Sequence, residues 1–266
     1  MWESDLFVHA AAVCAPGLAD WPAAAPVLQG REPYRAGPLA VPLPCGLPAN
    51  EQRRVMGSVR LALHAAAGAI AGTELADDLR LRAVFACSGG NAEALEAVLA
   101  AIAQPRGAVS PRHFSHLDHN AAAGYWAIVR GPASVSVSLG AFDGSFAAGL
   151  LEAAVACVDD PRVLLVAYDV PPPAPLQPFR PVHTSFAAAL LLGGEPQPGT
   201  ARRWRYGFVP EQPEASCADP GLERLRRENP AARCLPLLAL LAAGEPGAVV
   251  LPYLPGQCLR VEQRPC

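Results

Sequence analysis

The fold of this chain is indicated by one stretch, ASVSVSLGAFDGSFAAGLLEAAVAC, at residues 133–157. Its first part alternates serine with valine or leucine up to Leu139, the pattern of a half-buried or interface strand. A sharp turn through Phe142-Asp143-Gly144 follows, and a helix is expected from Ser145 to Cys157. Strand, sharp turn and helix in this order form an elbow, which lifts a side chain to the top of a sheet beside a helix N-terminus.

Strands and helices alternate on both sides of this elbow. Buried strands are expected at 6–14, 82–87, 162–169 and 185–192, and helices at 50–72, 92–103 and 120–128. The proline- and glycine-rich stretch 16–48 is expected to be loop. After residue 194 the pattern weakens to one helix at 231–243 and strand-like pieces at 248–253 and 258–262. This order predicts an α/β layered domain with a largely parallel central sheet.

The composition fits a globular protein with a large buried core. Of 266 residues, 52% are hydrophobic and only 17% are charged, a balance that is too apolar for disorder. The net charge of −3 provides no basic field that would attract nucleic acid or an anionic membrane. Apolar runs stay far below the roughly 20 residues that a membrane-spanning helix needs. We therefore expect neither nucleic acid nor a membrane as a partner.

The cysteines and the N-terminus favour a cytoplasmic protein. The 8 cysteines form no CxxC pair and have no regular spacing, so neither a zinc ribbon nor a disulfide framework fits. The first residues, MWESDLFVHAAAV, carry acids and lack the basic region and apolar core of a secretory signal. The chain contains no lysine, which excludes a Schiff-base or P-loop lysine. No cofactor is expected.

Asp143 and Cys87 are candidate reactive groups, and each has a structural alternative. A carboxylate at a helix start commonly caps the first amide hydrogens, and the helix dipole favours its charged form, which makes Asp143 a poor general acid. Cys87 lies between a strand and the turn Ser88-Gly89-Gly90. One interpretation is a thiol at a helix start with a lowered pKa, and the other is a buried cysteine that ends a core strand. No G-x-S-x-G motif supports a serine hydrolase elbow.

Three histidines lie in the proline-interrupted loop 105–119. His113, His116 and His119 are spaced three apart, and Asp118 lies beside them. Imidazole and carboxylate groups can hold a metal ion, but the spacing fixes no common face in an irregular loop and no second ligand motif is visible. Surface or interface histidines are the alternative, and we expect no metal site.

Several motifs in a fixed order carry a family resemblance that runs from about residue 5 to 194. The chain resembles the β-ketoacyl synthase chain length factors associated with aryl polyene pigment clusters. The motifs are LPANEQRR (47–54), VFACSGG (84–90), SP (110–111), HNAAAGYW (119–126), FAAGLLEA (146–153) and PRVLLVAYD (161–169).

The resemblance implies a thiolase-like layered α/β fold, with one N-terminal half of a condensing enzyme and a mixed central sheet. It implies a β-ketoacyl synthase-like N-terminal domain at 1–194. The remaining residues, 195–266, would form a short C-terminal extension of one helix and short strands, packed on the same domain.

The resemblance also implies that the chain is not an enzyme. In active condensing enzymes the elbow carries the cysteine that accepts the acyl chain, and that position falls here on Asp143, or on Ala141 when the count is shifted. Neither side chain can form a thioester. Cys157 lies at the far end of the following helix and cannot substitute. The family's second half supplies two catalytic histidines, and no histidine follows His183.

The implied role is pairing with an active β-ketoacyl synthase. In the family's dimer the strand before the elbow pairs with its equivalent across a two-fold axis, so a heterodimer is expected in aryl polyene or related type II fatty acid or polyketide biosynthesis. Acyl carrier protein would be reached through the partner. The chain would shape the partner's acyl tunnel, and the candidate partner- or tunnel-facing residues are Phe114, Leu117, Asn120, Tyr125, Trp126, Val135, Val137, Leu139 and Phe142.

Two other hypotheses remain open on the sequence. The first is a stand-alone acyl-ACP thioester enzyme, either a malonyl-ACP decarboxylase that uses Asp143 or an acyltransferase that uses Cys87. The second is a homodimeric scaffold unconnected with acyl chains.

Overall fold

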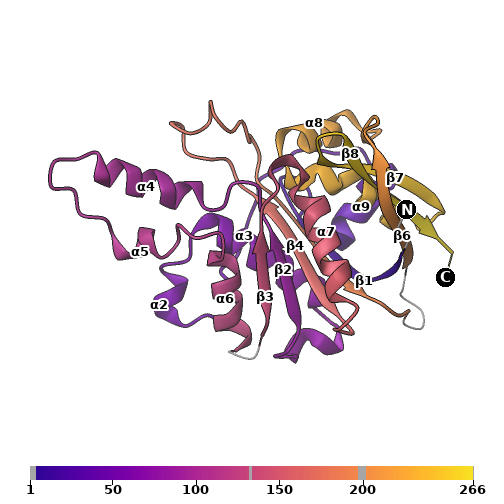
Figure 1. Cartoon of the computed structure of the whole chain (residues 1–266), viewed down its shortest axis with the longest axis horizontal. Helices are drawn as coiled ribbons and strands as arrows, with labels where there is room; N and C mark the ends of the chain where they lie inside the picture. Colours follow the sequence, from indigo (N-terminus) through magenta and orange to yellow (C-terminus); the bar gives the residue numbers. More distant parts are fainter. Residues whose placement is uncertain (1–3, 132–133, 197–201, 266) are drawn as a thin grey trace.

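One eight-stranded sheet carries the fold in the computed structural model, which describes residues 4–131, 134–196 and 202–265 (Figure 1). The strand order is β3-β2-β4-β5-β1-β6-β8-β7. The strands are β1 (Ser4–Cys14), β2 (Arg82–Ala86), β3 (Ser136–Leu139), β4 (Val163–Asp169), β5 (Phe186–Gly193), β6 (Arg202–Pro210), β7 (Gly247–Leu254) and β8 (Gln257–Arg264).

Helices cover both faces of this sheet. α3 and α6 pack on one face, and α1, α7, α8 and α9 pack on the other. β4 and β5 are buried along their whole length because both faces are covered. The helices are α1 (Trp21–Leu28), α2 (Ala49–Gln52), α3 (Gly57–Ile70), α4 (Ala92–Ile102), α5 (Pro111–Phe114), α6 (Ala121–Arg130), α7 (Ser145–Ala156), α8 (Pro220–Glu228) and α9 (Leu235–Ala243), with 3₁₀ turns η1 (Glu74–Asp77), η2 (Phe142–Gly144) and η3 (Ala231–Cys234).

The helices differ in how far they lie from the sheet. α4 and α5 reach away from it, at the left of Figure 1.

Among the residues that the structure describes, no helix combines the length and the apolar composition that crossing a membrane requires.

The sheet is mixed, as the family resemblance implies, and the expectation of a largely parallel sheet is wrong. Among the described strands, the β2–β3 and β2–β4 pairings are parallel, whereas the other five pairings are antiparallel. The connector 170–185 joins β4 to β5 and contains no helix. Without a crossover helix the chain returns antiparallel beside the strand that it has just left.

Two N-terminal expectations need correction. The stretch 16–48 contains α1, which Asp20 caps by accepting a hydrogen bond from the Ala23 amide, and the internal Pro26 conceals the helix in the sequence. The helix expected at 50–72 is divided into α2 and α3. Met56 is extended between them, and its sulfur accepts a hydrogen bond from Asn91.

The C-terminal segment continues the same sheet. β6 pairs with β1 and carries β8 and β7 beyond it, and the segment contains α8 in addition to the expected helix near 231–243. Asp219 caps α8, Pro220 occupies its first turn, and Leu222 and Leu225 are buried, so the sequence carried the signals for this helix. The domain boundary at 194 stays a prediction.

Candidate functional site at the β3–α7 elbow

The backbone of the elbow is strained where β3 turns into α7. Phe142 has φ of 53°, a left-handed conformation that is uncommon for a bulky residue. The hydroxyl of Ser145 holds this conformation, since it accepts a hydrogen bond from the Ala141 amide (3.0 Å) and donates one to the Phe142 carbonyl (2.6 Å). Such strain persists only where the surrounding structure fixes it.

Two packing contacts fix the elbow from outside. Gly144 lies so close to β7 that an added Cβ would be 2.2 Å from the carbonyl oxygen of Tyr253. The guanidinium carbon of Arg180 lies 3.8 Å from the centre of the Phe142 ring, in a cation–π contact. Residues far apart in the sequence therefore clamp the turn on both sides.

Asp143 is held in ion pairs, so its reading as a helix cap is wrong. Its Oδ1 lies 2.8 Å from Nη1 of Arg180, and its Oδ2 lies 3.8 Å from Nη2 of Arg233. Neither η2 nor α7 has a side-chain cap. The carboxylate of Asp143 therefore bridges two guanidinium groups from separate segments of the chain.

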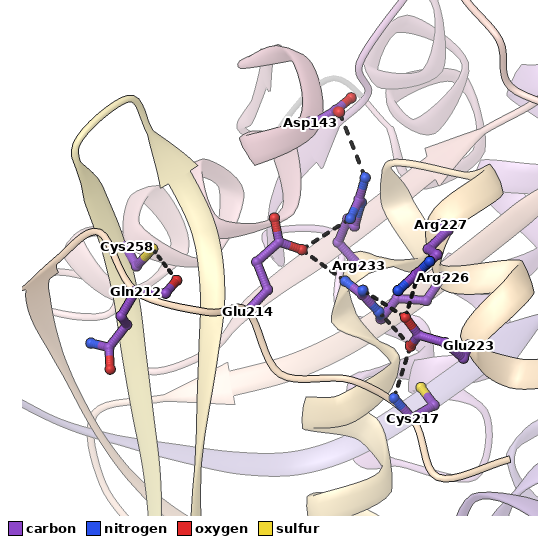
Figure 2. Close-up of polar contacts among 9 residues, drawn as sticks. All are labelled: Asp143, Gln212, Glu214, Cys217, Glu223, Arg226, Arg227, Arg233 and Cys258. Carbon is purple, nitrogen blue, oxygen red and sulfur yellow. Dashed lines mark hydrogen bonds and ion pairs between the residues drawn. The ribbon is translucent and has the colours of Figure 1, made fainter. Parts of the chain in front are cut away.

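Behind Asp143 a chain of ion pairs runs into the C-terminal segment (Figure 2). Oε2 of Glu214 lies 2.9 Å from Nη1 of Arg233 and 2.8 Å from Nη1 of Arg226. Arg226 in turn makes a bidentate pair with Glu223, with both contacts at 2.8 Å. The hydrogen bond from Arg226 lowers the pKa of Glu223 to about 2, against the opposing effect of burial. The elbow is thus tied to α8 and η3.

Cys87 lies at the end of β2 and is closed off from solvent. Its side chain is 2% exposed, and its Sγ lies 3.4 Å from Oδ1 of Asp169, which also accepts hydrogen bonds from the amide (3.0 Å) and hydroxyl (2.7 Å) of Ser88. Burial, and then the charge of Asp169, raise the pKa of the Cys87 thiol well above its usual range. The structure therefore favours the buried core group over a reactive thiolate.

Asp169 is itself a buried carboxyl group. Burial raises its pKa to about 6, although the hydrogen bonds from Ser88 oppose the shift. Its second oxygen is buried and has no hydrogen-bond partner in the part of the chain that the structure describes.

The three loop histidines have separate surroundings. His119 makes a hydrogen bond with the carbonyl of Cys87 (2.9 Å) and lies against Gly90 and Gly140. His116 is 2% exposed, contacts the ring of Tyr125 and has Nδ1 2.9 Å from the carbonyl of Arg112. In the described ranges no group of three or more histidine, cysteine or acidic side chains is arranged to hold a metal ion.

The structure divides the candidate partner-facing residues into two groups. Tyr125 and Trp126 are only 7% and 2% exposed, because both pack into the core on the inner side of α6, and their partner- or tunnel-facing role stays a prediction. Phe114, Val135 and Phe142 are exposed by 68%, 53% and 63%. Asn120 is also exposed, and the half-buried candidates are Leu117, Val137 and Leu139.

β3 lies at one end of the strand order. Val135 and Leu139 turn their carbonyls toward β2, where the amides of Ala83 and Cys87 donate to them. Because strand residues alternate, the backbone groups of Ser136 and Ser138 point to the outer edge. The strand was expected over 133–139, and residues 132–133 lie outside the described residues.

Sequence reasoning missed the side chains that hold the elbow. Arg180 lies in the proline-rich connector, Arg233 in η3 and Glu214 in the loop after β6, so none of them belongs to a local motif. Only the tertiary fold brings them to Asp143. Ser145 was the one visible clue, as a hydroxyl at the start of the predicted helix.

Solved structures of low sequence identity share this fold. A chain of the ketosynthase ApeO in complex with its chain length factor ApeC from Xenorhabdus doucetiae is 22% identical, with a TM-score of 0.69 over 97% of this chain and 98% of that one. A chain of the ishigamide ketosynthase/chain length factor is 14% identical, with a TM-score of 0.67 over 98% and 99%. A chain of AntDE:AntF, a type II PKS acyl-carrier protein in complex with its ketosynthase, is 13% identical, with a TM-score of 0.73 over 98% and 99%.

These likenesses confirm the thiolase-like ketosynthase fold. No curated protein matches the chain. The family model for the β-ketoacyl synthase N-terminal domain matches residues 29–243, which extends past residue 194, where the motif resemblance ends. The elbow, the mixed sheet and this match together place the chain in the family of β-ketoacyl synthase N-terminal domains.

Proposed function

We propose that the chain is a non-catalytic chain length factor that pairs with an active β-ketoacyl synthase. It would shape the partner's acyl tunnel in aryl polyene or related type II fatty acid or polyketide biosynthesis, in the cytoplasm, and acyl carrier protein would act through the partner. The observation that carries the proposal is the elbow: Asp143 lies there in ion pairs with Arg180 and Arg233, and Ala141, the other candidate position, is inert.

The edge strand supports a partner at this place. β3 presents the backbone groups of Ser136 and Ser138 outward, and exposed Val135 and Phe142 lie at its two ends. An open edge is a template for pairing with a strand of another chain. Two of the structures with this fold contain a ketosynthase and a chain length factor, which fits the proposed pairing.

The geometry disfavours the alternative of a stand-alone thioester enzyme. An acyltransferase needs a thiolate that substrate can reach, whereas Cys87 is buried and its pKa is raised. A decarboxylase based on Asp143 would have to work with a carboxylate that two arginines already neutralise.

Co-expression with the ketosynthase from the same genome tests the pairing. We expect a stable one-to-one complex in size-exclusion chromatography with light scattering at micromolar concentration. Separate migration of the two proteins, together with ketosynthase products of unchanged length, would contradict the proposal.

A substitution on the outer edge of β3 tests where the partner binds. Ser138→Pro removes an outward amide but no hydrogen bond to β2, so the chain should fold and lose the complex. Ser138→Ala keeps the amide, and the Ser138 hydroxyl has no hydrogen-bond partner among the described residues, so this control should form the complex normally. If the proline variant pairs as tightly as the alanine variant, the partner does not extend this strand.

A further inference from the structure

A cavity of about 630 Å³ lies beside β1, away from the elbow. It is lined by β1, by α3 and by the turn that begins α1, and Arg202, the first residue of β6, also contributes to the lining. Its size falls in the range of roughly 300 to 1,000 Å³ that is usual for small-molecule sites. The side chains that supply polarity are His9, Asp20, His64 and Arg202.

A β-bulge places His9 at this cavity. In the pairing of β1 with β5, Val8 lies opposite Leu192 and Ala10 opposite Leu191, so His9 is the extra residue. Gly193 makes room for the imidazole ring, since a Cβ at that position would be 2.6 Å from Nε2 of His9. Bulges of this kind re-aim side chains and are frequent near functional sites.

The imidazole of His9 has no partner for either nitrogen. Both nitrogens are buried, and no hydrogen bond reaches them in the described ranges. Burial, and then the charge of Arg162, lower the pKa of His9 to about 4, so the ring is neutral near pH 7 and offers one N–H donor and one acceptor. Buried polar groups are normally satisfied, and here a bound molecule would have to supply the partner.

Arg202 provides a cation at the same cavity. It is exposed at the start of β6 and pairs with no carboxylate in the part of the chain that the structure describes. An adjoining cavity of about 140 Å³ is lined by both His9 and Arg202, together with Trp21, which puts the two polar side chains around one small space. A guanidinium beside an N–H donor suits a carboxylate.

The rest of the wall suits a flat apolar group. Ala12, Ala65 and Ala69 line the large cavity, and Gly68 approaches β1 so closely that an added Cβ would be 3.1 Å from the Cβ of Ala12. These small side chains leave a smooth floor, and the indole of Trp21 adds an aromatic wall.

We propose that this cavity binds a small carboxylic acid with a flat apolar body, whose carboxylate contacts Arg202 and His9 and whose body lies on the alanine floor. The proposal is independent of the elbow and of the proposed pairing with a ketosynthase.

Benzoate and benzamide are matched probes, because they share a shape and differ in charge. Isothermal titration calorimetry of the full chain should show benzoate binding at least about tenfold more tightly than benzamide. Arg202→Gln should abolish this preference, and His9→Phe, which keeps a ring but removes both nitrogens, should weaken benzoate binding severalfold. Arg80→Gln replaces an exposed arginine that does not line the cavity, and this variant should bind benzoate like the wild type.

Three results would overturn the proposal. They are no benzoate binding at millimolar concentration, equal binding of benzamide, and unchanged benzoate affinity in the Arg202 variant. Circular dichroism checks that each variant is folded, and because Arg202 is exposed its variant decides the outcome if His9→Phe fails to fold.

Discussion

Asp169 joins the ends of two parallel strands through a buried carboxyl group. Its Oδ1 accepts hydrogen bonds from Ser88 beyond β2, while its own backbone carbonyl accepts one from Asn229 (3.0 Å). Burial raises its pKa to about 6, so the folded state holds the proton more tightly than the unfolded state does, where the ordinary value of 3.8 applies. Ionisation of Asp169 therefore lowers the free energy of unfolding as the pH rises from 3.8 to about 6.

Asp169→Asn removes this titration while keeping an oxygen acceptor for Ser88. As the pH rises from about 4 to about 7, the free energy of unfolding of the wild type should fall relative to that of the variant by up to about 3 kcal/mol. Urea unfolding of both proteins at several pH values measures the difference, in which the other titrating groups cancel. If the free energy of unfolding has the same pH dependence in both proteins, ionising Asp169 costs no more in the folded state than in the unfolded state.

Single residues of the site were only partly predictable from the sequence. The turn Phe142-Asp143-Gly144 was predicted because a β-like alternation ends there and a helix begins. The ion pairs of Asp143 were not predictable, since Arg180 and Arg233 come from segments without local motifs. The burial of Tyr125 and Trp126 was not predictable either, because aromatic residues on a helix suit a core and an interface alike.

The elbow depends on close contact between η2 and β7. Gly144 faces the backbone of Tyr253, and backbone atoms cannot rotate away as a flexible side chain can. The glycine is thus required for packing, in addition to any role in the turn. Gly124 in α6 differs, because an added Cβ there meets no atom within 4 Å.

Gly144→Ala should destabilise the chain by about 1 to 3 kcal/mol, since the new methyl group has to push η2 away from β7. Gly124→Ala is the matched control and should stabilise α6 by up to about 1 kcal/mol, because alanine favours helix more than glycine does. Thermal unfolding of both variants gives the comparison. Equal melting temperatures for the two would mean that the elbow does not need its contact with β7.

Elements with strong local signals were predicted well, and those that depend on distant contacts were not. β4 and β5 read as continuous apolar runs and are fully buried strands. β6 was expected only as a polar, arginine-rich patch, because Trp204 is its one buried residue and Arg203 and Arg205 form ion pairs with Asp5. Pairing direction was also beyond local pattern, since it depends on whether a connector contains a helix.

In the whole molecule the open sheet edge of β3 lies beside the elbow. β3 ends the strand order at one side, and the ion pairs of Asp143 connect the following turn to Arg180 in the connector and to Arg233 in the C-terminal segment. This arrangement makes the elbow a rigid support for the edge strand. An open edge on such a support suits the pairing with another protein that we propose.

Mass spectrometry of the co-purified complex after incubation with acyl carrier protein thioester tests this role most directly. We expect a one-to-one assembly with a single acyl group, which stays on the ketosynthase when the subunits are separated. An acyl group attached to this chain, or a complex that lacks the ketosynthase, would contradict the account.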